Sequence, residues 1–383
     1  MLDLPSHRPT RAEINLDNLI HNLRVTSAAL GEGIAIMPAV KADAYGHGAV
    51  ECARALEEAG AQWFGVALPE EGITLREAGI AKPILCLGGF WEGQEGSLIA
   101  QRLTPVVFRL ELLDRLDRAA RASEVIVDYH LKVDTGMGRL GVPRGELKAF
   151  LDGASRLENV RLDGVLTHLA SADSQDHSDF TERQMRSFED AVEIIRARGH
   201  RPTWIHQANS AGAHAYPSSR GNLVRLGGVL YGLWRDVTNR SIPPLDWRAV
   251  MSLHTRVMLV KTVPAYTALG YGGTYVTSRE SRIATLPIGY EDGLSRALSN
   301  RGEVIVRGRL APIVGRVSMD LTLVDVTDIE DVGMDDEVVV IGIQGGIQLT
   351  AESIASQIGS ISYEVTCGVS DRVPRIYSRN RSR

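Results

Sequence analysis

Lys41 is the first residue whose type and setting suggest covalent chemistry. It closes an apolar run over residues 34–40 and is followed by the glycine-containing stretch 42–48. An amine at the mouth of a buried strand is desolvated, which lowers its pKa and enlarges its neutral, nucleophilic fraction. Because a neutral lysine amine forms a Schiff base with a carbonyl group, we expect Lys41 to be a covalent attachment point.

Two later segments predict a phosphate site. Asn209 and Ser210 offer a hydroxyl and the N-terminus of a short helix, and Gly227 and Gly228 allow backbone N–H groups to approach an anion closely. A reactive lysine and a phosphate site are together the minimal equipment for pyridoxal 5′-phosphate, which joins a lysine as an imine and is held by its phosphate. We therefore expect this cofactor.

The elements that position these residues alternate between two patterns. Amphipathic stretches with helical spacing lie at 48–59, 70–78, 110–122 and 180–197, and Asp17 is expected to cap a helix that precedes the first strand. The apolar runs between them give eight candidate strands, at residues 34–40, 63–68, 83–87, 105–108, 126–133, 162–168, 204–207 and 223–226. Eight strand–helix repeats in roughly 230 residues favour a (β/α)8 TIM barrel over an open sheet.

The barrel hypothesis predicts where reactive residues should lie. In such barrels they sit just past the C-terminal ends of the strands. Lys41 follows the first expected strand, the segment 134–139 follows the fifth, and His168 ends the sixth. Asn209 follows the seventh strand and Arg225 lies at the end of the eighth. The polar residues therefore gather at the end of the barrel where an active site is expected.

The pattern changes after Pro243 and Pro244. Beyond them, β-branched segments are separated by Gly, Pro and Asp turns, and helical spacing returns only at 350–358. These segments are residues 253–263, 281–287, 303–306, 322–326 and 337–341. We expect a cofactor-binding barrel at 13–244 and a mostly β domain at 245–383, with residues 1–12 packing against the second domain.

Composition narrows the class of protein. The chain has 383 residues, 44% of them apolar and 23% charged, as in ordinary globular proteins. A net charge of −5 without a long basic block argues against nucleic acid as a partner. The three cysteines match no zinc spacing and suggest free thiols in a reducing compartment. No signal-like or membrane-spanning run occurs, so we expect a cytoplasmic enzyme without a metal.

Eleven short motifs, in order along nearly the whole chain, resemble the alanine racemase family, which is of the fold-type III pyridoxal phosphate class. They are AVKADAYGHG at 39–48, KVDTGMGRLG at 132–141, TH at 167–168, ANSA at 208–211, VRLG at 224–227, YG at 231–232, GYGGTY at 270–275, GYEDG at 289–293, GRVSMD at 315–320, and YEV at 363–365 with RVPR at 372–375. The resemblance implies racemisation of L- and D-alanine, which supplies D-alanine for peptidoglycan.

The resemblance also implies a role for each matching residue. Lys41 would bind the cofactor and act as a base on one face of the substrate Cα, with Tyr271 as the base on the opposite face. His168 would lower the pKa of Tyr271, since an ordinary tyrosine pKa of about 10 suits a poor base. Arg225 would face the pyridine nitrogen, and Arg139 the phenolic oxygen and the substrate carboxylate. The remaining cofactor, substrate and modified positions would be Tyr45, Asn209, Ser210, Gly227, Gly228 and Tyr363 for the cofactor, Met319 and Asp320 for the substrate carboxylate, and Lys132 as a carbamylated lysine (N6-carboxylysine).

Four positions depart from the family pattern. Ser318 stands where many relatives have cysteine, and Gly228 where isoleucine is common; Glu291 and Asp371 also differ from common residues and affect the expected substrate breadth. The family implies a head-to-tail homodimer in which Lys41 of one subunit meets Tyr271 of the other. The alternatives are a racemase of broader specificity, a related pyridoxal phosphate decarboxylase, and a non-catalytic cofactor-binding protein.

Overall fold

The computed structural model describes residues 8–238 and 243–379, and the chain divides into two compact units. The barrel unit comprises Leu19–Ala44 and Ala49–Arg248. The β unit comprises the chain up to Asn18, the short segment Tyr45–Gly48, and the chain from Ala249 onward. The boundaries expected at 13–244 and 245–383 stay a prediction, and residues 1–7 of the expected N-terminal segment lie outside the described residues.

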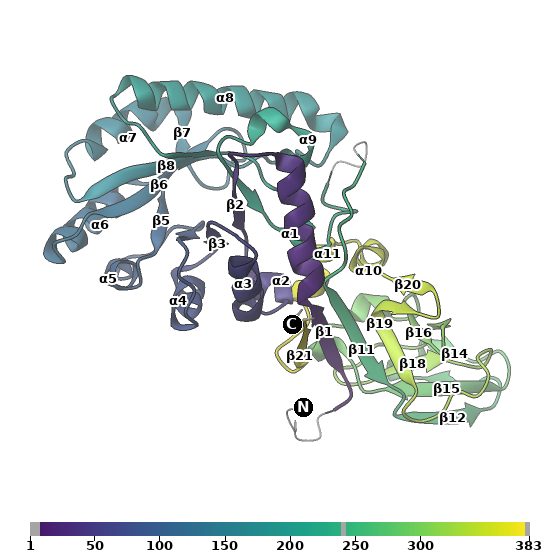
Figure 1. Ribbon diagram of the computed structural model, residues 1–383. Helices are drawn as coiled ribbons and strands as arrows, with labels where there is room; N and C mark the ends of the chain where they lie inside the picture. The colour runs from purple at the N-terminus through teal and green to yellow at the C-terminus, as the bar shows by residue number, and fades with distance from the viewer. Residues whose placement is uncertain (1–7, 239–242, 380–383) are drawn as a thin grey trace. The chain divides into compact units, whose positions relative to one another are not determined.

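Eight parallel strands form the barrel, and Figure 1 labels β2, β3, β5, β6 and β8 among them. They are β2 (Ala35–Pro38), β3 (Phe64–Val66), β4 (Ile84–Cys86), β5 (Thr104–Val107), β6 (Val127–Asp134), β8 (Val160–Leu166), β9 (Trp204–His206) and β10 (Leu223–Leu226). Strands β3, β4, β5, β6, β8 and β9 pair in that order, and β10 pairs with β2. Hydrogen bonds from Val40 N to Gly65 O, 2.9 Å, and from Asn222 N to Ile205 O, 3.2 Å, bridge the two remaining joints. The predicted barrel and its eight strands are confirmed.

Helices on the outside of the barrel separate most of these strands (Figure 1). They are α3 (Ala49–Glu58), α4 (Pro69–Glu77), α5 (Glu95–Ala100), α6 (Leu110–Ala122), α7 (Leu147–Ala154), α8 (Ser178–Ala197) and α9 (Ser210–Ala215), with the short strand β7 (Val142–Pro143) beside β6. The helix expected before the first strand is α1 (Leu16–Leu30). Its predicted cap was wrong. Asn15 accepts the hydrogen bond from Asn18 N at 2.9 Å, while Asp17 lies one residue inside the first turn, where its charge favours the helix dipole.

The barrel interior is a packed apolar core. Six buried side chains from different strands and their flanks meet there: Met37, Trp63, Leu85, Val106, Leu166 and Leu223. Removal of this surface from water is the main stabilising contribution to the unit. The core therefore supplies a rigid base for the polar residues at the strand ends.

The β unit contains a seven-stranded and a three-stranded sheet and one hairpin. The first has the order β17-β16-β19-β11-β1-β21 with β20 on β19, the second is β12-β15-β18, and the hairpin is β13-β14. Their bounds are β1 (Arg11–Asn15), β11 (Met251–Arg256), β12 (Leu259–Val263), β13 (Ala268–Leu269), β14 (Tyr275–Val276), β15 (Ser281–Leu286), β16 (Glu303–Val306), β17 (Arg309–Pro312), β18 (Thr322–Asp325), β19 (Glu337–Gln344), β20 (Ile347–Leu349) and β21 (Arg375–Ser378). Two helices, α10 (Ala351–Ile358) and α11 (Ser362–Cys367), complete the unit.

One expected strand, 253–263, is in fact two. Val257 N donates to Asp336 O and Met258 N to Thr285 O, so the chain leaves one sheet and joins the other at this point. An apolar β-branched run carries no signal for such a change of sheet, because both halves have strand composition.

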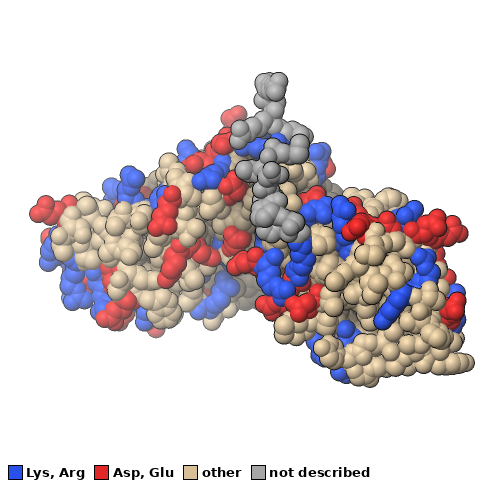
Figure 2. Space-filling view, turned by 90° about the horizontal axis from the view of Figure 1, so that it is seen from below, with Lys and Arg blue, Asp and Glu red and all other residues tan. Residues whose placement is uncertain are grey.

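The surface charge is mixed. On the face shown in Figure 2, basic and acidic side chains are interspersed. Among the described residues, no helix combines the length and apolar character that a membrane span requires.

Candidate active site

The carboxyl ends of the barrel strands carry the predicted reactive residues. Lys41 lies three residues beyond β2, Lys132 lies near the end of β6, and Arg225 lies within β10. His168 lies two residues beyond β8, because the strand ends at Leu166 and not at His168 as predicted. Since all these strands run parallel in one barrel, the barrel unit brings these four side chains to one end.

Lys41 begins a turn of unusual handedness, α2 (Lys41–Gly46). Ala42 to Tyr45 have φ between 51° and 56°, and Gly46 has φ of 83°. A left-handed turn costs roughly 1–2 kcal/mol for each non-glycine residue, so the four residues together store about 4–8 kcal/mol. Such strain persists only where surrounding contacts over-determine it.

Glu71 of α4 supplies much of that restraint. Its Oε1 accepts a hydrogen bond from Ala42 N at 2.7 Å, and its Oε2 accepts from Ala67 N at 2.6 Å and Leu68 N at 3.2 Å. Asp43 Oδ1 in turn accepts from Ala49 N at 2.7 Å. The half-buried Lys41 is therefore fixed to the ends of two neighbouring strands.

Lys132 is buried in a field of positive charge. Burial, followed by the charges of Arg225 and Arg139, lowers the pKa of the Lys132 amine to about 8, although Asp134 opposes the shift. The same cations and burial hold the pKa of His168 well below its usual value. Lys132 thus has a sizeable neutral fraction near neutral pH, and His168 is uncharged.

Arg225 is held in one orientation by backbone carbonyls. Its NH1 donates to His206 O at 3.1 Å, and its NH2 donates to Thr167 O at 2.7 Å and Gln207 O at 2.9 Å. Burial lowers the pKa of this guanidinium to about 10. The group remains charged at neutral pH and its geometry is set before any ligand binds.

Two buried histidines continue from Arg225 into the barrel. Arg225 NH1 lies 2.8 Å from His206 Nδ1, and His206 Nε2 lies 2.9 Å from His130 Nδ1. A guanidinium only donates, so His206 Nδ1 is the acceptor and His206 carries its hydrogen on Nε2. His206 Nε2 therefore donates a hydrogen bond to His130 Nδ1. His130 Nε2 then lies 3.9 Å from Asp163 Oδ2. Sequence reasoning missed these two histidines, although each lies in a predicted strand where polar residues are rare.

The loop that carries Arg139 is folded around Asp134. Asp134 Oδ1 accepts from Gly136 N at 2.9 Å and from Gly138 N at 3.1 Å. Gly141 closes the loop with φ of +136°, and a Cβ there would lie 2.5 Å from Asp134 N. Only glycine fits this position, so Gly141 of this motif has a steric reason.

The predicted phosphate residues of the barrel unit adjoin one another. Gly227 N donates to Ser210 Oγ at 2.9 Å, which joins the end of β10 to the first residue of α9. Asn209 caps this helix by accepting from Gly212 N at 2.9 Å, and its Nδ2 donates to Leu169 O at 3.2 Å. The side chain of Asn209 therefore has a structural task. The Ser210 hydroxyl, whose oxygen accepts from Gly227 N, keeps its own hydrogen for an anion.

A second group of predicted cofactor residues lies on the β unit. The rings of Tyr45 and Tyr363 meet edge to face, with centroids 5.0 Å apart and an interplanar angle of 63°. Burial raises the pKa of the Tyr45 hydroxyl, so it remains a neutral hydrogen-bond donor. The α11 helix carries Tyr363.

The β unit also holds Tyr271, Met319 and Asp320. Tyr271 begins a 3-10 turn between β13 and β14, and 74% of its surface is exposed. It borders an open groove of about 780 Å³ whose lining includes Met258, Leu259 and Leu321. Met319 is itself half exposed.

Sequence reasoning also missed the residues that hold two site loops together. Gln184 of α8 accepts from Ala170 N at 2.9 Å and donates to His168 O at 3.1 Å. Thr135 and Thr167 share a hydrogen bond of 2.8 Å. A buried glutamine on the apolar face of a predicted helix is the signal that was available for Gln184.

Comparisons with known proteins identify the family to which this two-unit chain is similar. Residues 14–234 match the family model described as "Alanine racemase, N-terminal domain", and residues 250–377 match "Alanine racemase, C-terminal domain". The chain is 45% identical over 372 residues to an alanine racemase of Halothermothrix orenii, covering 97% of each chain. It is 41% identical over 379 residues to one of Geobacter sulfurreducens, again covering 97% of each.

The solved structures that match this chain are also alanine racemases. The alanine racemase of Bacillus anthracis with bound L-Ala-P matches with a TM-score of 0.93 and 36% identity, over 98% of this chain and 97% of that one. The alanine racemase of Bartonella henselae with covalently bound pyridoxal phosphate matches with a TM-score of 0.86 and 28% identity, over 98% of this chain and all of that one. The family models, the relatives and the solved structures all match over nearly the whole chain, which belongs to the alanine racemase family.

Proposed function

We propose that the protein interconverts L-alanine and D-alanine with pyridoxal 5′-phosphate as its cofactor. The observation that carries the proposal is the fixed guanidinium of Arg225 beside Lys132 and His168, at the same barrel end as Lys41. Membership of the alanine racemase family supports the same reaction.

The donors present suit this cofactor. The Lys41 amine suits the aldehyde carbon, and Arg225 suits the ring nitrogen. The Ser210 hydroxyl and the N–H group of Gly228 suit the phosphate, and the N–H group of Gly227 would join them by exchanging its bond to Ser210 Oγ for one to the phosphate. When bound, the cofactor supplies an electron-withdrawing ring conjugated to the amine of alanine, which acidifies the hydrogen on Cα.

Arg225 determines how strong that withdrawal is. With a pKa of about 10, roughly one guanidinium in a thousand is deprotonated at pH 7. Arg225 therefore donates a hydrogen bond to the ring nitrogen and keeps its proton. A ring nitrogen without a proton attracts electrons less strongly, which limits side reactions such as transamination.

Two bases on opposite faces of Cα carry out racemisation. Lys41 exchanges a proton on one face, and the hydroxyl of Tyr271 exchanges a proton on the other. Arg139 orients the cofactor's phenolic oxygen and the substrate carboxylate, and Met319 and Asp320 receive that carboxylate on the β unit. A proton removed on one face and returned on the other inverts the configuration.

Tyr271 is proposed to serve the site of a second copy of this chain. Its high exposure, together with the apolar lining of the adjoining groove, supports a surface that a partner covers. Lys41→Ala and Tyr271→Ala chains, each nearly inactive alone, test this arrangement. A mixed dimer contains one site with both bases intact, so random mixing should restore about a quarter of wild-type activity. No recovery in dimers confirmed as mixed would contradict a shared site.

Polarimetry with L-alanine and with D-alanine, each with and without added cofactor, tests the reaction. The rotation should decay toward zero from either enantiomer, and deuterium from solvent should enter Cα. A protein that binds the cofactor but leaves both rotations unchanged would refute the proposal. Parallel assays with L-serine and L-lysine measure substrate breadth, and carbon dioxide release would reveal a decarboxylase. The cytoplasmic location and the supply of D-alanine for peptidoglycan stay predictions.

A further inference from the structure

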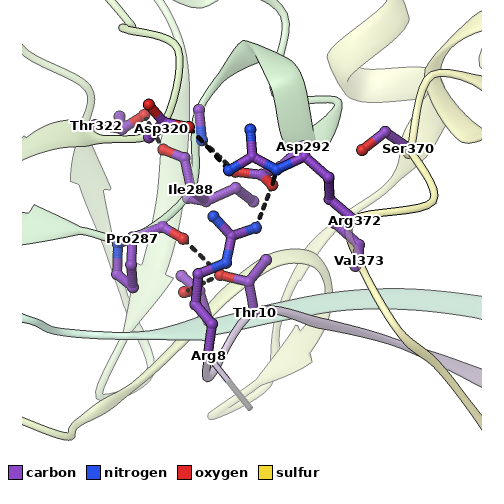
Figure 3. A network of polar contacts seen from close by, with 12 residues as sticks. Arg8, Thr10, Pro287, Ile288, Asp292, Asp320, Thr322, Ser370, Arg372 and Val373 are labelled. Atoms are coloured by element: carbon purple, nitrogen blue, oxygen red, sulfur yellow. Dashed lines mark hydrogen bonds and ion pairs between the residues drawn. The ribbon is translucent and has the colours of Figure 1, made fainter.

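Four charged side chains of the β unit form a continuous network, shown in Figure 3. Arg8 donates to Asp292 Oδ1, and Arg372 Nε lies 3.6 Å from the same oxygen. Arg372 NH2 also donates to Asp320 Oδ1 at 2.8 Å. The Asp292 side chain is completely buried, whereas Arg8, Arg372 and Asp320 are partly exposed. The charges alternate in sign along the network and sum to zero.

Asp292 shapes a turn that contacts the loop of residues 318–320 directly. Its Oδ2 accepts from Gly289 N at 3.0 Å and closes the 3-10 turn Tyr290–Asp292. Within this turn, Tyr290 N donates to Ser318 O at 3.0 Å and Glu291 N donates to Met319 O at 3.1 Å. The two backbones touch, because a Cβ on Gly289 would lie 2.3 Å from Met319 O.

The 318–320 loop is closed by hydrogen bonds between its first residue and Leu321, and two of its N–H groups take no part in them. Ser318 N and Ser318 Oγ both donate to Leu321 O, at 3.1 Å and 2.6 Å. Within residues 8–238 and 243–379, the N–H groups of Met319 and Asp320 have no hydrogen-bond acceptor. Consecutive N–H groups of this kind form a concave receiver for an anion such as a carboxylate.

The negative charge of the Asp320 side chain opposes the binding of an anion at these N–H groups. A carboxylate beside the N–H groups repels the carboxylate of alanine, at a cost that grows as water is excluded. Arg372 offsets the repulsion because its guanidinium bonds to Asp320 and, through Asp292, links the loop to Arg8. Thr10, two residues after Arg8, is anchored by a 2.6 Å bond from its hydroxyl to Pro287 O.

We propose that Arg8 and Arg372 are positioning residues for the substrate carboxylate. Through Asp292 and Asp320 they hold the 318–320 loop in the form that presents its N–H groups, and they cancel the charge of Asp320. This inference rests on the proposed function, since it assigns the alanine carboxylate to that loop. Neither arginine touches the reacting atoms, so their effect is on substrate binding and not on the proton transfers.

Neutral variants of the full-length, cofactor-loaded enzyme test the proposal. Arg8→Gln and Arg372→Gln should each raise KM for both enantiomers of alanine about tenfold and change kcat by less than about twofold. The affinity for pyridoxal phosphate, measured by absorbance titration, should stay unchanged. Arg279→Gln is the matched control, because Arg279 pairs with Asp328 at 2.6 Å on the same unit outside this network. It should leave KM unchanged.

Lysine variants keep the test decisive if a neutral variant fails to fold. Arg8→Lys and Arg372→Lys retain the charge that buried Asp292 requires but lose the planar guanidinium, so KM should rise about threefold. An unchanged KM in folded variants overturns the proposal, as does a fall in kcat without a change in KM.

Binding of propionate, which is alanine without its amine, separates this inference from the proposed reaction. Calorimetry should show that both arginine variants weaken propionate binding by about the same factor as they raise KM. This result is independent of turnover, so a wild-type protein that binds propionate but does not racemise alanine refutes only the proposed function. Undetectable propionate binding by the wild type, or equal binding by wild type and variants, overturns the role of the network.

Discussion

The carbamate predicted on Lys132 has an acid–base basis that is open to experiment. Burial and the charges of Arg225 and Arg139 lower the pKa of this amine from 10.5 to about 8. Only the neutral amine reacts with carbon dioxide. At pH 7 about one amine in ten is neutral when the pKa is 8, against about one in 3,000 for an ordinary lysine, so the reactive form is enriched roughly 300-fold.

The lowered pKa of Lys132 also determines whether stability rises or falls with pH. The folded pKa lies below the unfolded one, so between pH 8 and 10.5 the unfolded chain binds more protons and stability rises with pH. Below about pH 8 the full penalty of a buried ammonium remains. Formation of a carbamate removes that penalty and places a negative charge beside Arg139, so bicarbonate should stabilise the folded protein.

Nuclear magnetic resonance with ¹³C-labelled bicarbonate at pH 8 measures the modification. The wild type should show one carbamate signal, which Lys132→Met should abolish and which Lys148→Met, a change at an exposed lysine of α7, should leave intact. Bicarbonate should raise the melting temperature of the wild type by about 2–4 °C for each kcal/mol gained, and should not affect Lys132→Met. Identical spectra for wild type and Lys132→Met would refute the reasoning.

Three further changes test the geometry of the barrel site. Gly141→Ala would place a Cβ 2.5 Å from a backbone nitrogen at a φ of +136°, so the loop that carries Arg139 should shift and alanine turnover should fall about tenfold or more in a steady-state assay. Glu71→Ala removes three accepted hydrogen bonds and should lower the free energy of unfolding in urea by about 1–3 kcal/mol, while Glu71→Gln should lose less. Arg225→Lys keeps the charge but loses the planar set of carbonyl contacts, so cofactor absorbance should change and kcat should fall at least about tenfold; an unaltered spectrum would contradict the assigned contact with the ring nitrogen.

The barrel was predictable because its signals are local. Each parallel strand is a short apolar run bounded by turn residues, and each of the eight expected runs overlaps a strand. The β unit was harder, since β13 and β14 have two residues each and β1 joins its sheet from the other end of the chain. Pairings over such sequence separations leave no local pattern. Sequence composition likewise gave no sign that residues 253–263 change sheet.

The reactive residues of the site were predictable from the sequence, but the residues and turns that hold them in place were less so. Lys41 and Arg225 were identified from strand ends, where the barrel hypothesis predicts chemistry. The left-handed turn after Lys41 was not, because alanine and tyrosine do not favour positive φ and the contacts of Glu71 and Asp43 that restrain the turn leave no local sequence signal. His206, which fixes one side of Arg225, was missed because a single buried histidine carries no spacing signal.

The cations of the barrel end explain both the ligand preference and the state of His168. Burial and the charges of Arg225, Lys132, Arg139 and Lys41 hold its pKa well below the usual value, so it cannot lower the pKa of a tyrosine as a positive charge. Arg225 NH2 also lies 3.5 Å from His168 Nδ1, although its two hydrogens are donated to Thr167 O and Gln207 O. The cations themselves repel one another until an anion binds, and a phosphate, a carboxylate and a carbamate each relieve that repulsion.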